Sequence, residues 1–72
     1  MEHKLFIGKD CHDCQKVVEF IVKNDLEVDI INLDEDDATE PPIQIFVRPA
    51  LFVNGDLKAY GTDIIAYLKQ NN

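Results

Sequence analysis

The stretch that decides the fold is KLFIGKDCHDCQKVVEFIV, which covers residues 4–22. It begins with a short apolar run that ends at Gly8, as a short strand does. From Cys14 onward, apolar residues recur every three to four positions, which is the spacing of one face of a helix. The residues on this face are Cys14, Val17, Val18, Ile21 and Val22. The pattern predicts a strand over residues 4–8 that leads directly into an amphipathic helix.

Three further apolar segments follow this helix. Residues 28–33 predict a second strand, and its apolar residues on both faces are typical of a covered parallel strand. Residues 50–53 and 57–60 flank Asn54-Gly55. Asn-Gly between apolar runs is the strongest local signal for a hairpin, because both turn positions need positive φ. Gly61-Thr62 then leads into a last helix. The apolar stripe of that helix is Ile64, Ile65 and Leu68.

The segment between the second strand and the hairpin is less regular. Residues 34–40 carry five carboxylates, which is typical of a solvated loop. Pro41-Pro42 can open one turn of helix, whereas residues 43–47 do not distinguish a helix from extended chain. The sequence therefore predicts one α/β domain over residues 1–72, with the order β-α-β-(short helix)-β-β-α and a four-stranded mixed sheet. The aromatic core candidates are Phe6, Phe46, Phe52, Tyr60 and Tyr67.

Composition and charge limit the classes of partner. The chain has 14 acidic against 7 basic residues, a net charge of −7, which disfavours binding to nucleic acid and to anionic membrane surfaces. No apolar run approaches the ~20 residues of a membrane span, and the first residues lack the features of a signal peptide. We therefore expect a monomeric cytoplasmic protein whose partners are proteins or small thiols.

Cys11 and Cys14 form a C-x-x-C motif at the predicted strand-to-helix junction. A disulfide between them closes too small a loop to stabilise the fold much, which favours a chemical role. Cys11 falls at the helix start, where the helix dipole and free N–H groups stabilise a thiolate. Cys14 lies one turn further on the same side, among the apolar residues. We predict that Cys11 attacks a substrate disulfide and that Cys14 resolves the mixed disulfide.

Three further residues are candidates for a role in this chemistry, two as modulators of the thiol and one as a substrate-binding residue. A protonated His12 would stabilise a Cys11 thiolate, whereas Asp13 would oppose it. The alternative for His12 is an exposed loop residue without a role. Arg48, the only arginine, is suited to hold a substrate carboxylate through paired hydrogen bonds. The alternative for Arg48 is an ordinary surface charge.

The chain resembles the glutaredoxins and short thioredoxin-like proteins. The matching features are the Cys11–Cys14 motif after a strand, the run RPALFVNG over residues 48–55, and a last helix led by Gly61. The resemblance implies a minimal thioredoxin fold in which Pro49 is cis and faces the cysteines. It also implies that the backbone of Arg48 pairs with an extended substrate segment.

The chain departs from the glutaredoxin pattern at three places. These are His12-Asp13 inside the motif, Val47-Arg48 before the proline, and Ala59-Tyr60 after the hairpin. Glutaredoxins carry residues there that help to hold glutathione, so the departures weigh against a glutathione site.

Three functions follow from the motif and the resemblance. The preferred one is a dithiol reductant of protein disulfides that needs no metal or other cofactor and is recycled by a thioredoxin reductase-like enzyme or by glutathione. The second is a glutathione-linked glutaredoxin. The third is a non-enzymatic module in which the cysteine pairs of two chains hold zinc or an iron–sulfur cluster.

Overall fold

The computed structural model describes residues 2–35, 37 and 40–70. In chain order, its elements are β1 (His3–Ile7), α1 (His12–Lys23), β2 (Asp29–Asn32), β3 (Ala50–Val53), β4 (Asp56–Tyr60) and α2 (Asp63–Gln70). The predicted α/β fold with a four-stranded mixed sheet is therefore confirmed. No helix in the described part of the chain is long and apolar enough to cross a membrane.

The sheet has the strand order β2-β1-β3-β4. β1 is parallel to β2 and antiparallel to β3, and β3 is antiparallel to β4. The β3–β4 hairpin turns at Asn54 and Gly55, whose φ values of 52° and 86° are those that the Asn-Gly signal predicts. Ile7 and Asn32 pair at the ends of the parallel strands. The segments that follow these two strands therefore leave the sheet at the same edge.

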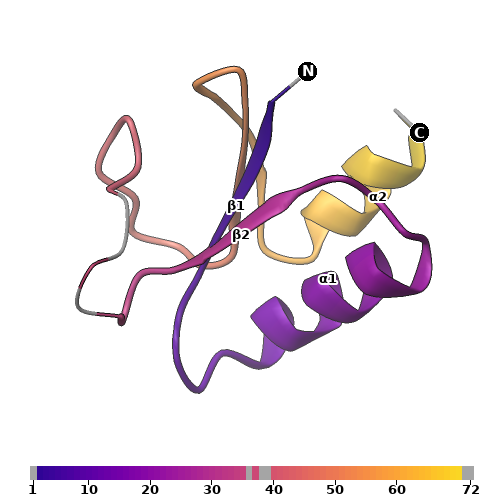
Figure 1. Ribbon diagram of the computed structural model, residues 1–72, viewed down its shortest axis with the longest axis horizontal. Coiled ribbons are helices and arrows are strands. Elements are labelled where there is room, and N and C mark those ends of the chain that lie inside the picture. Colours follow the sequence, from indigo (N-terminus) through magenta and orange to yellow (C-terminus); the bar gives the residue numbers. More distant parts are fainter. Residues whose placement is uncertain (1, 36, 38–39, 71–72) are drawn as a thin grey trace.

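The two faces of the sheet are covered by different parts of the chain. α1 and α2 lie together on one face (Figure 1), where the fully buried Leu51 packs in a cluster with helix residues. On the opposite face, Phe6 and Phe52 meet edge to face with ring centroids 5.3 Å apart. Ile45, from the connection between β2 and β3, packs against these rings. This connection, rather than a helix, covers the second face of the sheet (Figure 1).

Several core expectations are wrong. β2 is an edge strand and is covered only in part, because Ile31 packs against the Phe6–Phe52 cluster whereas Ile30 is 39% exposed. Phe46 is 87% exposed, and Val22 and Tyr60 are exposed as well. Apolar character alone does not distinguish these positions from buried ones. The other aromatic candidates lie in or against the core.

The short helix expected between the second strand and the hairpin is not found in the described residues of that segment. Residues 40–47 form bends without a helical turn, and residues 36, 38 and 39 lie outside the described part. Pro42 disfavours a helical conformation at Pro41, and Pro49 does the same at Arg48. The prolines therefore disfavour helix at both ends of this segment.

Candidate redox site

The chain turns sharply between β1 and the cysteine pair. Asp10 has a φ of 56°, a left-handed conformation that aspartate adopts more readily than most residues. Cys11 follows as the extended N-cap of α1, and its Sγ accepts a hydrogen bond from the backbone N–H of Cys14 at 3.1 Å. The predicted position of Cys11 at the helix start is confirmed. The Cys14 N–H, which has no acceptor within the helix, thus donates to the sulfur, and this contact favours a thiolate at Cys11.

Cys11 and Cys14 are joined by a disulfide, with their Cα atoms 5.2 Å apart. Cys14 is only 2% exposed, whereas Cys11 is partly exposed. An open hollow of about 280 Å³ reaches both cysteines, and Ile7 and Val18 contribute apolar surface to its wall. Cys11 is therefore the cysteine that a partner molecule meets first.

The residues just before β3 lie beside the disulfide. The Arg48–Pro49 peptide bond is cis, as the resemblance implies, and Pro49 is fully buried. The Pro49 carbonyl accepts a hydrogen bond from the N–H of Gly61 at 2.8 Å, which fixes this segment to the connection before α2. The carbonyl oxygen of Arg48 lies 3.8 Å from Cys11 Sγ. The structure thus brings together Cys11, Arg48 and Pro49, although they come from distant parts of the sequence.

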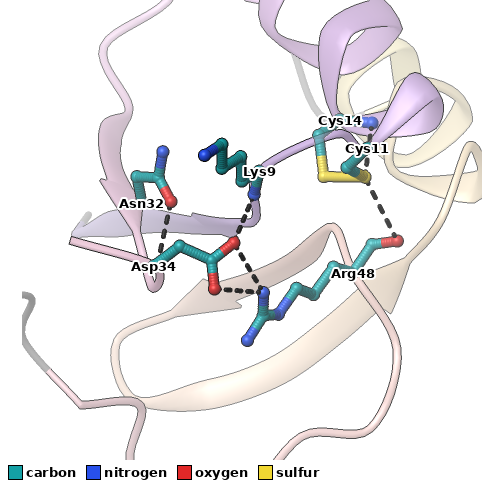
Figure 2. The surroundings of a disulfide bond; sticks show 6 residues. All are labelled: Lys9, Cys11, Cys14, Asn32, Asp34 and Arg48. Carbon is teal, nitrogen blue, oxygen red and sulfur yellow. Dashed lines mark hydrogen bonds and ion pairs between the residues drawn. A yellow bond between two sulfur atoms is a disulfide. The ribbon is translucent and has the colours of Figure 1, made fainter.

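The side chain of Arg48 runs away from the disulfide and ends at Asp34 (Figure 2). Arg48 Nη1 donates to both carboxylate oxygens of Asp34, at 3.1 and 3.3 Å. The same carboxylate accepts a hydrogen bond from the backbone N–H of Lys9. The guanidinium that was expected to meet a substrate carboxylate is therefore paired inside the chain, and its binding to a substrate stays a prediction.

Gly8 leaves room for this arrangement. A Cβ atom at Gly8 would collide with Arg48 Nη1 and would lie 2.7 Å from Arg48 Cδ. The Arg48 side chain therefore crosses the end of β1 directly above a position without a side chain. The sequence predicts Gly8 as the end of a strand but assigns neither Gly8 nor Asp34 to the site. The β-α-β order was the signal that could have found them, because parallel pairing of its two strands places the residues after both strands at one end of the sheet.

His12 and Asp13 occupy the first turn of α1, and both side chains are exposed. Within the described residues, neither side chain has a hydrogen-bond or ion-pair partner. Their modulating roles therefore stay predictions that depend on charge alone. Both side chains are exposed, so any charge on them would act on Cys11 through solvent, which screens it.

The described residues contain no group of three or more His, Cys, Asp or Glu side chains that could hold a metal ion. No protein-family model matches the chain, and comparisons with curated proteins and with solved structures find no match.

Asp34 gives the site a pH-dependent contribution to stability. The hydrogen bond from the Lys9 N–H and, next, the Arg48 side chain lower the pKa of Asp34 below its ordinary value of 3.8. Its ionised form therefore stabilises the fold above the unfolded-state pKa, and this contribution is lost as the pH falls through the lower folded-state pKa. We expect Asp34→Asn to be less stable than the wild type at neutral pH, and the difference to shrink towards about pH 2.

Urea unfolding of both proteins at neutral and acidic pH measures this difference. The other carboxylates are common to both proteins, so their titration cancels in the comparison. A stability difference that stays constant across this range would contradict the prediction.

Proposed function

We propose that the chain is a thiol–disulfide oxidoreductase with a minimal thioredoxin fold, which reduces protein disulfides in the cytoplasm through Cys11 and Cys14. The observation that carries this proposal is the disulfide at the N-terminus of α1, in which Cys11 is partly exposed and Cys14 is buried. The Arg48–Pro49 segment beside Cys11 adds support. It matches, in kind and position, what the resemblance to glutaredoxins and thioredoxin-like proteins implies.

The reaction begins from the dithiol form. The Cys11 thiol loses its proton to solvent, and the thiolate attacks one sulfur of the substrate disulfide. A bond forms between Cys11 Sγ and that sulfur while the substrate S–S bond breaks, and the departing thiolate takes up a proton. The product of this step is a mixed disulfide.

Cys14 completes the reaction. Its thiol loses a proton, and the thiolate attacks Cys11 Sγ, which lies one helical turn away. The second substrate sulfur leaves and takes up a proton. The substrate has then gained two electrons and two protons, and the chain holds the Cys11–Cys14 disulfide. A thiol reductant, either a thioredoxin reductase-like enzyme or two glutathione molecules, returns it to the dithiol.

Coupled turnover tests this function. We expect the chain to accelerate reduction of a model protein disulfide in the presence of NADPH and a thioredoxin reductase. We expect a slower rate when glutathione and glutathione reductase replace that enzyme, because the sequence departs from the glutaredoxin pattern where glutathione is held. The matched control is the Cys11→Ser/Cys14→Ser double variant. Rates equal to this control with both reductants would contradict the proposal.

A further inference from the structure

The backbone and the side chain of Arg48 contact different residues. Its carbonyl oxygen lies 3.8 Å from Cys11 Sγ, whereas its guanidinium reaches back to Asp34 (Figure 2). The side chain therefore starts next to the reactive sulfur and is held pointing away from it. Because arginine has a long stem of rotatable bonds and the Arg48 side chain is 40% exposed, a guanidinium released from Asp34 can turn towards Cys11.

Two hydrogen bonds at Asp34 and the absence of a side chain at Gly8 allow the Asp34 carboxylate to meet the guanidinium. The Lys9 N–H donates to one of its oxygens. The backbone N–H of Asp34 donates to Asn32 Oδ1 at 3.0 Å, which orients the residue at the end of β2. Gly8 leaves the path of the Arg48 side chain open. Asp34 is thus held by the backbone in a position to pair with Arg48. Its neighbour Glu35 has no such side-chain contact among the described residues.

We propose that Asp34 is a positioning residue that holds the Arg48 guanidinium away from Cys11, so that the Cys11 thiolate receives no direct ion pair from this side chain. This inference rests on the proposed function and specifies how the reactivity of its nucleophile is set. A guanidinium beside the thiolate would lower the thiol pKa. It would also stabilise the dithiol form and make the cysteine pair a weaker reductant. Asp34 therefore favours the reducing direction of the exchange.

Other charged groups also act on Cys11, and the test must separate them from Asp34 and Arg48. They include Glu19, which lines the same hollow as the cysteines, and the sequence neighbours Lys9, Asp10, His12 and Asp13. They are unchanged in every variant below, so their contributions cancel when the variants are compared.

A double-mutant cycle on the reduced protein tests the proposal. The measured quantity is the Cys11 thiol pKa, from the rate of iodoacetamide alkylation against pH with the labelled residue identified by mass spectrometry. We expect Asp34→Asn to lower this pKa by roughly 0.5 to 1 unit, less than the ~1–3 units of a fixed ion pair because the released side chain is flexible. In Arg48→Gln, the Cys11 thiol pKa should stay near its wild-type value. Asp34→Asn should have little further effect in the Arg48→Gln background.

Two further variants separate position from charge. Glu35→Gln removes the same charge from the next residue and should change the pKa less than Asp34→Asn. Gly8→Ala keeps every charge but places a Cβ where the Arg48 side chain lies, so it should also lower the pKa. Gly8→Ala also serves as the test if Asp34→Asn fails to fold.

Two outcomes would overturn the proposal. One is an Asp34→Asn shift that matches the Glu35→Gln shift, and the other is an Asp34→Asn shift that persists undiminished in the Arg48→Gln background. Alkylation of the chemically reduced protein needs no substrate disulfide and no reductase, so this test stands even if the coupled turnover assay fails. A failed turnover assay with the expected alkylation cycle would remove the proposed function but keep the role of Asp34.

Discussion

A Cys11→Ser variant is expected to show no disulfide exchange above background, whereas a Cys14→Ser variant is expected to stop at a mixed disulfide with its substrate. The first variant lacks the partly exposed sulfur at the N-terminus of α1, and a serine hydroxyl does not replace a thiolate nucleophile. The second keeps that sulfur but lacks the buried thiol that resolves the mixed disulfide. The two variants should therefore fail at different steps.

Two measurements separate these failures. Non-reducing electrophoresis should show a covalent adduct with a protein disulfide for Cys14→Ser and none for Cys11→Ser. In the reduced wild type, limiting iodoacetamide should label Cys11 before Cys14. Preferential labelling of Cys14, or an adduct that forms through it, would reverse the assignment of the two roles.

Much of the fold could be predicted from local pattern. The strand-to-helix junction at Cys11 follows from apolar spacing, and the hairpin follows from Asn54-Gly55, because both signals depend on residues close in sequence. The cover on the second face of the sheet could not be predicted in this way. Ile45 and Phe46 are adjacent and both apolar, yet Ile45 packs under the sheet and Phe46 is exposed. Which of them turns inward depends on how the connection between β2 and β3 crosses that face.

The same distinction, between features set by local sequence and features set by tertiary contacts, applies to the candidate site. The two cysteines and their order of burial follow from the helix spacing, and the cis Pro49 followed from the resemblance. Asp34 is one of five carboxylates within residues 34–40, and nothing in its sequence neighbourhood distinguishes it from Glu35. Its contacts with Lys9 and Arg48 arise from the parallel pairing of β1 with β2 and from the path of the chain into β3. Within the described part of this charged loop, a carboxylate with fixed contacts can therefore lie next to a solvated one such as Glu35.

The Phe52→Ala variant is expected to lose about 3–5 kcal/mol of the free energy of unfolding. Phe52 is 1% exposed, and its ring meets Phe6 on the sheet face that lacks a helix. Among the described residues, the rest of this cluster is the small buried Ala50 together with partly buried side chains from the edge strand and the β2–β3 connection, so the cavity has few large neighbours that can close it. A chain of this length has roughly 4–11 kcal/mol of total stability. The expected loss is therefore a large fraction of the total stability.

Phe46→Ala is the matched control, because it removes the same ring from a position that is 87% exposed. It should change the free energy of unfolding by no more than about 0.5 kcal/mol, as surface substitutions usually do. Urea unfolding followed by circular dichroism measures both variants. The contrast between them tests whether the β2–β3 connection covers the sheet with Ile45 inward and Phe46 outward. Equal losses in both variants would mean that Phe46 packs in the core, and this description of the second sheet face would then be wrong.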